Sequence, residues 1–142
     1  MRKLITLIIF YIISISVGIA ETCPTIQDIK NGNFHAWRLY DSDSHQPLNT
    51  KYVPQFKQYA QQFTLAEWHK DSKQRNIIRC YYRDFNGSEA RAYLAKKDFH
   101  PEIVKNTWYS VSGSLHCAAG RNHCVFQNNQ SSHQLARNDS PG

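Results

Sequence analysis

Arginine and tyrosine side chains alternate along one stretch of the chain, a pattern that suits recognition of anions. On the predicted strand 76–84 (NIIRCYYRD) two arginines flank a tyrosine on one side, and the segment expected to pair with it adds another arginine and tyrosine. Guanidinium groups hold phosphate, sulfate or sugar acids through forked hydrogen bonds, and phenol rings stack on such ligands. The alternative is an ordinary solvated sheet face. The candidate ligand-binding residues are Arg79, Tyr81, Arg83, Arg91 and Tyr93.

The chain also has seven histidines, which raises the hypothesis of general acid–base catalysis as in secreted ribonucleases. Such chemistry needs two histidines, or a histidine and a carboxylate, around a phosphate with a cation nearby. Glu67 and His69 can share a strand face, with Arg79 close by, but nothing in the sequence places a second histidine there. A G-x-S-x-G motif and a Gly-rich phosphate loop are both missing from the sequence. We therefore assign no catalytic residue and favour a protein that is not an enzyme.

The first twenty residues are typical of a secretory signal peptide. Arg2 and Lys3 precede an apolar run over residues 4–15, and the small residues Gly18 and Ala20 close the segment. The run is short for a transmembrane anchor, which needs about 20 apolar residues. Cleavage after Ala20 leaves 15 basic and 11 acidic residues, a net charge of +4 that favours anionic partners. We expect an exported protein, periplasmic or extracellular, without a transmembrane segment after cleavage.

Four cysteines lie in the exported part, and an even number in an oxidising compartment predicts two disulfides. A histidine precedes each of the last two cysteines, which raises a zinc site as an alternative. The spacing differs from that of zinc fingers, and neighbouring residues of a strand point to opposite sides. We therefore expect no metal and no cofactor. Of the three possible pairings we favour Cys23–Cys80 with Cys117–Cys124.

Short alternating runs separated by turn signals predict a mainly β fold, with α+β as the alternative: a small antiparallel β-rich domain with one or two short helices, stapled by two disulfides. We expect this single secreted domain over residues 21–127 and a disordered polar tail over 128–142. Asn86-Gly87 predicts a hairpin, and a three-residue loop would pair Tyr81 with Tyr93. Segment 23–30 is a short entry segment that Pro24 is expected to keep extended at its start. Helices are expected over 54–61 and from about residue 100. The expected strands are 34–40, 63–69, 76–84, 89–97, 107–112, 115–118 and 124–127.

The order of Cys23-Pro24, a tryptophan strand, Cys80-Tyr81-Tyr82 and a closing C-x6-C-x-F resembles small exported bacterial proteins grouped in families of unknown function. The resemblance covers most of the exported part and implies an exported bacterial domain, but no activity. We therefore expect a disulfide-stabilised binding or interaction module. Its partner would be an unknown protein or an anionic ligand, and nucleic acid is one unsupported candidate.

Two other hypotheses stay open. One is a small secreted hydrolase of nuclease type that uses histidine and carboxylate. The other is an inhibitor of an envelope or host hydrolase, because small disulfide scaffolds suit that task. A cleft that holds two histidines or a His–Glu pair would favour the enzyme, and an Arg/Tyr face without one would favour binding.

Overall fold

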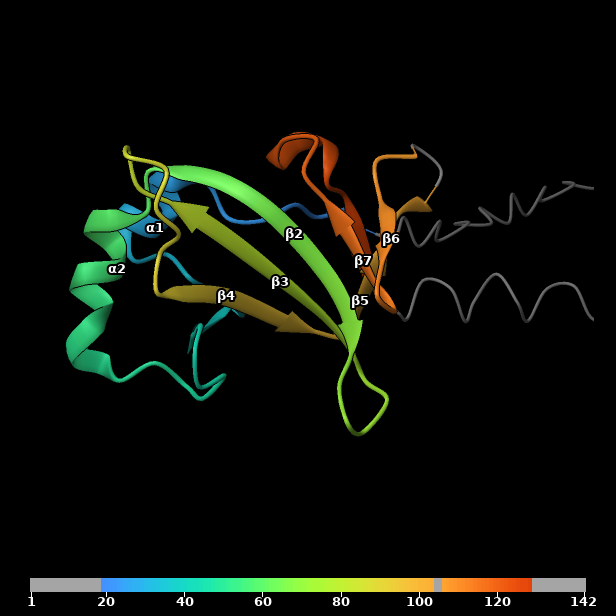
Figure 1. Cartoon of the computed structure of the whole chain (residues 1–142), viewed down its shortest axis with the longest axis horizontal. Helices are drawn as coiled ribbons and strands as arrows, with labels where there is room; N and C mark the ends of the chain where they lie inside the picture. The colour runs from blue at the N-terminus through green and yellow to red at the C-terminus, as the bar shows by residue number, and fades with distance from the viewer. Residues whose placement is uncertain (1–18, 104–105, 129–142) are drawn as a thin grey trace, which may run out of the picture.

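A computed structural model describes residues 19–103 and 106–128. They form a β-rich fold of antiparallel sheets with two short helices and two disulfides. The main sheet has six strands in the order β1-β4-β3-β2-β7-β6, and β5 pairs with β8 in a second sheet (Figure 1). The strands are β1 (Arg38–Asp41), β2 (Gln62–Lys70), β3 (Asn76–Arg83), β4 (Ala92–Lys97), β5 (Phe99–Pro101), β6 (Tyr109–Val111), β7 (Ser114–Cys117) and β8 (Phe126–Asn128). Most of the predicted signal and nearly all of the predicted tail lie outside the described residues.

Helix α1 (Ile26–Asn31) occupies most of the entry segment, for which no helix was predicted; Thr25, at the start of the segment, is extended as expected. Thr25 and Asp28 form a capping box, in which each side chain accepts a hydrogen bond at 3.0 Å from the backbone N–H of the other residue. Gly32 ends the helix in the left-handed conformation, with φ of 70°. Pro24 restricts only the residue before it and therefore does not oppose a helix that begins two residues later.

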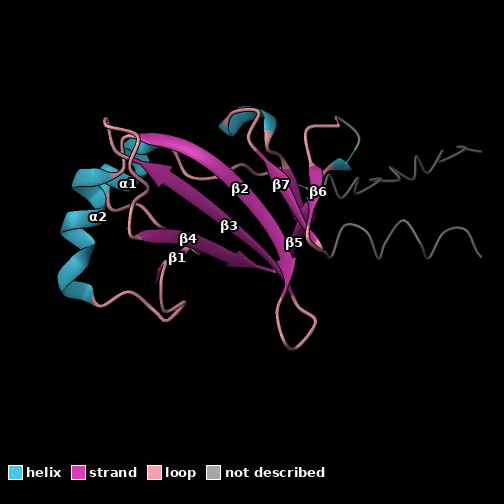
Figure 2. Ribbon diagram, viewed as in Figure 1, coloured by secondary structure: helices cyan, strands magenta, loops and turns pink. Residues whose placement is uncertain are grey.

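Helix α2 (Val53–Tyr59) confirms the helix expected over 54–61. It follows a short 3-10 turn, η1 (Thr50–Tyr52), and has Pro54 in its first turn, where a missing N–H costs nothing. The ring of Phe56 packs edge to face on Tyr82, with 6.3 Å between centroids. Both helices lie at one end of the main sheet (Figure 2).

The larger of two hydrophobic clusters, here called the core, lies on one face of the main sheet. Ile78, Cys80 and Tyr82 of β3 are buried there, as their alternation with the polar residues of the strand predicts. The two helices and the β5–β8 sheet contribute to the same cluster. Trp37 and Trp108 are buried in it and Trp68 is partly buried against it, so all three indoles are packing residues.

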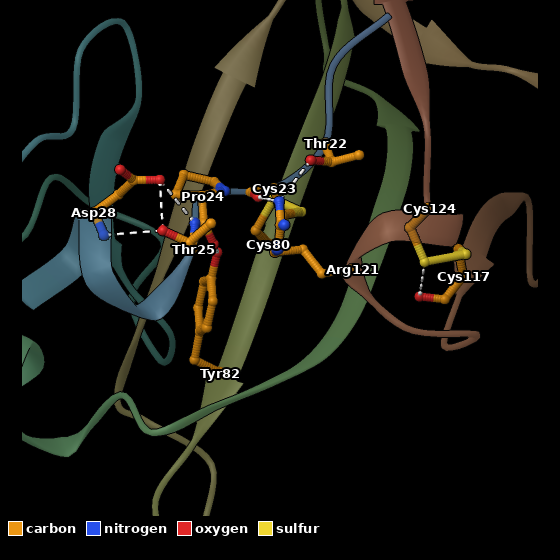
Figure 3. Close-up of a disulfide and its surroundings, with 10 residues drawn as sticks. All are labelled: Thr22, Cys23, Pro24, Thr25, Asp28, Cys80, Tyr82, Cys117, Arg121 and Cys124. Atoms are coloured by element: carbon orange, nitrogen blue, oxygen red, sulfur yellow. Dashed lines mark hydrogen bonds between the residues drawn. A yellow bond between two sulfur atoms is a disulfide. The ribbon is translucent and has the colours of Figure 1, made fainter.

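Both predicted disulfides are confirmed, with Cα atoms 5.8 Å apart for Cys23–Cys80 and 5.6 Å apart for Cys117–Cys124 (Figure 3). The first bond fixes residue 23 to the centre of the sheet. Beside it, the Tyr82 hydroxyl donates to the Pro24 carbonyl oxygen at 2.6 Å. Every cysteine is oxidised, so none offers a thiolate to zinc. Within residues 19–103 and 106–128, neither helix is long and apolar enough to cross a bilayer.

A β-bulge in β2 decides which side chains of this strand face the core. Phe63 lies opposite Tyr82 and Leu65 lies opposite Tyr81, so Thr64 is the extra residue. Simple alternation would put Phe63 and Glu67 on the same face. The bulge instead lets Phe63 pack against the core while Glu67 lies on the opposite face.

The β3–β4 hairpin brings Tyr81 against Tyr93 as expected, with ring centroids 5.3 Å apart, but its loop is longer than expected. Asp84 holds the turn, because its carboxylate accepts from the backbone N–H groups of Asn86 and Ser88 at 2.9 Å. Glu89 forms only an isolated bridge with Arg83, and the strand begins at residue 92 instead of 89.

The prediction of a helix from about residue 100 is wrong, because residues 99–101 form β5 and pair with β8. Pro101 sits at the end of a strand in a two-stranded sheet, a position that tolerates its missing N–H. The other expected strands are present with shifted ends, most of all β1, which begins at residue 38 instead of 34.

Candidate functional site

One row of directly opposed residues crosses all six strands of the main sheet on the face opposite the core, here called the polar face. The backbone registers of five strand pairs define this row. Each strand contributes one side chain at this level, since side chains alternate between the faces. Following the spatial order β1-β4-β3-β2-β7-β6, the residues of the row are Arg38, Ala95, Arg79, Glu67, His116 and Tyr109.

Glu67 is the centre of this row and contacts two histidines and an arginine. Its Oε1 lies 3.3 Å from Arg79 Nη1 and 3.7 Å from His69 Nδ1, and its Oε2 lies 3.2 Å from His116 Nε2. Tyr81 donates its hydroxyl to Oε1 at 3.4 Å. The Glu67 side chain is 18% exposed. It is therefore reachable from solvent and at the same time enclosed by cationic and hydrogen-bonding groups.

Three tyrosines form an aromatic cluster beside the row. Tyr93 stacks on Tyr40 and tilts against Tyr81, and the Arg79 guanidinium lies 5.0 Å from its ring centroid. The Tyr93 hydroxyl also lies 3.2 Å from Nδ1 of His45. This histidine sits in the left-handed conformation, with φ of 56°, in the loop after β1.

Asp41, the last residue of β1, shapes the loop that carries His45. Its carboxylate accepts from the backbone N–H groups of Asp43 and Ser44 and from the Ser44 hydroxyl. Short hydrogen bonds of this kind fix a turn without a regular element. The loop therefore presents an imidazole to the aromatic cluster in a defined position.

A pocket of about 530 Å³, here called the basic pocket, opens on the polar face. Ala95 is the small residue between Arg38 and Arg79, so a cleft remains between the two guanidinium-bearing side chains. Lys97 is exposed at its edge. The side chains of Arg38 and Lys97 form no hydrogen bond or ion pair with any residue in the described ranges. The residues of this pocket used below are Arg38, Tyr40, His45, His69, Arg79, Tyr93 and Lys97.

Burial sets the protonation of the site. Burial lowers the pKa of His69, and the Arg79 guanidinium acts in the same direction, so this imidazole is neutral at pH 7. Burial together with the Glu67 carboxylate raises the pKa of Tyr81 to about 12. Burial also raises the pKa of Tyr93. Both phenols therefore stay neutral and can donate hydrogen bonds at physiological pH.

Of the five residues proposed from the sequence, the structure brings three together and places two elsewhere. Arg79, Tyr81 and Tyr93 form one contiguous group, as described above. Arg83 lies farther along β3, where its Nε donates to Gln62 Oε1 at 3.0 Å. Arg91 lies before β4 and lines a different pocket, of about 560 Å³.

This second pocket, here called the acidic pocket, contains three carboxylates, Asp41, Asp84 and Glu89. The carboxylates of Asp41 and Asp84 already accept hydrogen bonds from backbone N–H groups of their own turns. Although it is slightly larger, the acidic pocket has no cluster of acid–base groups comparable to that around Glu67.

Three residues of the site, His116, His45 and Arg38, could not be assigned to it from the sequence. His116 is placed beside Glu67 by the pairing of β7 with β2, a contact between distant parts of the chain. Arg38 enters through the pairing of β1 with β4. The alternation of His116 with the core residues Leu115 and Cys117 was the one available signal that it faces away from the core.

Comparisons with protein families, with curated proteins and with solved structures find no match for this chain. The resemblance to small exported bacterial proteins stays a prediction.

Proposed function

We propose that this protein is an exported binding module that recognises phosphate or sulfate groups in the basic pocket. The observation that carries the proposal is the pair of uncompensated cations, Arg38 and Lys97, beside Arg79 in one cleft. A guanidinium group offers several N–H donors in a planar fork that matches tetrahedral oxyanions. On an ordinary solvated sheet face, we would expect such charged side chains to be spread over the surface instead of lining one cleft.

Two other charged residues that line the pocket, Asp71 and Lys96, already form ion pairs within the protein. Asp71 binds Arg75 at 2.7 Å, which leaves its carboxylate a weak competitor for a ligand. Lys96 binds Glu21 at 2.6 Å and therefore adds little to the pocket. The aromatic cluster supplies a flat apolar wall, on which a sugar or base attached to the anion can stack.

A single-stranded DNA oligonucleotide and a heparin-derived hexasaccharide are suitable probes for phosphate and sulfate, titrated by fluorescence anisotropy at two salt concentrations. If three cations each neutralise one phosphate, the logarithm of affinity for DNA falls with slope about −2 against the logarithm of salt. That slope weakens binding about 20-fold between roughly 50 and 200 mM salt. Failure of both probes to bind at low salt would refute the proposal.

Arg38→Gln should weaken binding and reduce the salt slope by about 0.7, because one phosphate contact is lost. Arg91→Gln is the matched control, since Arg91 is an exposed arginine outside the basic pocket. Equal effects of the two substitutions would show that binding depends on net charge and not on this pocket.

A further inference from the structure

Two histidines and an arginine surround one carboxylate on the polar face, an arrangement that anion binding alone does not require. The negative charge of Glu67 opposes the binding of an anion, yet it lies in direct contact with Arg79. A carboxylate in contact with histidines can orient them for proton transfer, which would explain why it is present beside an anion site. Glu67 contacts one imidazole with each of its oxygens, His69 with Oε1 and His116 with Oε2.

We propose that the group Glu67, His69, His116 and Arg79 cleaves single-stranded RNA by transfer of its phosphodiester to the neighbouring 2′-hydroxyl. This inference rests on the proposed function, because the basic pocket must first hold the phosphate backbone. It adds a reaction to that function and narrows the ligand to RNA.

Each ring nitrogen has a defined direction. His69 Nδ1 is buried and faces Glu67, which leaves Nε2 as the nitrogen that can reach a ligand in the pocket. His116 lies outside the lining of the basic pocket, beside Glu67 on the neighbouring strand β7; it presents Nε2 to Glu67, which leaves Nδ1 for a ligand that extends beyond the pocket. His69, neutral at pH 7, is the proton acceptor, and His116 takes the role of proton donor. Glu67 is a positioning residue that lies within hydrogen-bond distance of the His116 ring, at 3.2 Å, and 3.7 Å from the His69 ring.

The reaction balances with these groups. His69 removes the proton from the 2′-hydroxyl while the 2′-oxygen forms a bond to phosphorus. The bond from phosphorus to the 5′-oxygen breaks, and His116 delivers its proton to that oxygen. Arg79 stabilises the charge that develops on the non-bridging oxygens. The products are a 2′,3′-cyclic phosphate and a 5′-hydroxyl, and exchange with solvent restores the two imidazoles.

RNA fits this site better than DNA because it carries its own nucleophile. All four cysteines are in disulfides, and the residues in contact with Glu67 include no serine, threonine or cysteine. A 2′-hydroxyl next to phosphorus reacts with the advantage of proximity. Tyr109, half exposed against the His116 ring, offers a surface on which an unstacked base can lie.

The test uses the DNA oligonucleotide of the binding assay with one ribonucleotide placed in it. We expect the purified exported chain, with its disulfides intact, to cut only after the ribonucleotide. Mass spectrometry should show a cyclic phosphate on one fragment and a 5′-hydroxyl on the other. Cleavage at deoxy linkages, or no cleavage of an oligonucleotide that binds, would overturn the inference. The second result leaves the proposed function intact, whereas absence of binding removes both.

Variants purified in parallel separate the site from contaminating nucleases. His69→Ala and His116→Ala should each lower the cleavage rate about 100-fold or more. His123→Gln is the matched control, since His123 is exposed in the loop between Cys117 and Cys124. Unchanged rates in both alanine variants would attribute the cleavage to another protein and overturn the inference.

Glu67→Gln gives a readout that a merely structural residue would not. Loss of the negative charge should tighten binding of the DNA probe severalfold and slow cleavage of the ribonucleotide at least tenfold. The acidic limb of the rate–pH profile reports His69, which faces Glu67, Arg79, Asp71 and His45. In the native protein it should lie below the ordinary imidazole value of about 6.5. Equal weakening of binding and cleavage would refute the positioning role.

Discussion

The two disulfides should differ in their contribution to stability, because they close loops of different length. Cys23–Cys80 spans 57 residues of sequence and Cys117–Cys124 spans 7. Loop-closure entropy gives about 4.2 kcal/mol for the long loop and about 2.4 kcal/mol for the short one. Replacing each pair by alanines should therefore lower the free energy of unfolding by amounts that differ by about 2 kcal/mol.

Urea denaturation followed by tryptophan fluorescence measures this difference in the two double variants and the native chain. All four cysteines are at most 1% exposed, so the loss of buried sulfur is similar in both variants and cancels in the comparison. An equal or larger loss for the Cys117–Cys124 pair would refute the reasoning. It would show that contacts in the folded state, and not restriction of the unfolded chain, decide the contribution.

Three further predictions concern single groups. Tyr82→Phe removes the buried hydrogen bond to the Pro24 carbonyl oxygen and should lower the free energy of unfolding by about 1–3 kcal/mol in urea denaturation. The pKa of Tyr81 is raised to about 12, so its neutral phenol stabilises the folded state fully below about pH 10. This stabilisation is lost as the pH rises towards 12. In an absorbance titration, the phenolate step near pH 12 should be missing in Tyr81→Phe. Hydrogen bonds from Arg75 lower the pKa of Asp71 to about 2, so the β2–β3 turn should be held above about pH 4 and loosen as the pH falls towards 2. NMR shifts of this turn should follow that titration and lose it in Asp71→Asn.

Local signals in the sequence were enough to predict most strands, both disulfides and part of the candidate site. Alternation in β3 separated Arg79 and Tyr81 from the core residues, and that separation depends only on the pleat of one strand. The spacing of two residues in β2 likewise suggested that Glu67 and His69 lie on one face. These inferences needed no knowledge of distant pairing.

The rest depended on contacts between segments far apart in the chain. His116 reaches Glu67 only because β7 joins the edge of β2, and no local pattern specifies that partner. Likewise, Pro101 lies in strand β5 because β8 pairs with residues 99–101. Helix α1 is a different case, since the Thr25–Asp28 capping box was present in the sequence and was not recognised.

The Cys117–Cys124 bond makes the geometry of the polar face depend on the redox state of the compartment. His116 directly precedes Cys117, so the strand that delivers its imidazole to Glu67 is fixed by a bond that forms only under oxidising conditions. A chain that stays in the thiol-rich cytosol lacks this fixation, so the proposed RNA cleavage would be slow inside the producing cell. Cleavage should therefore be much slower in protein refolded with free thiols than in oxidised protein, and equal rates would show that the bond does not protect the cell that makes it.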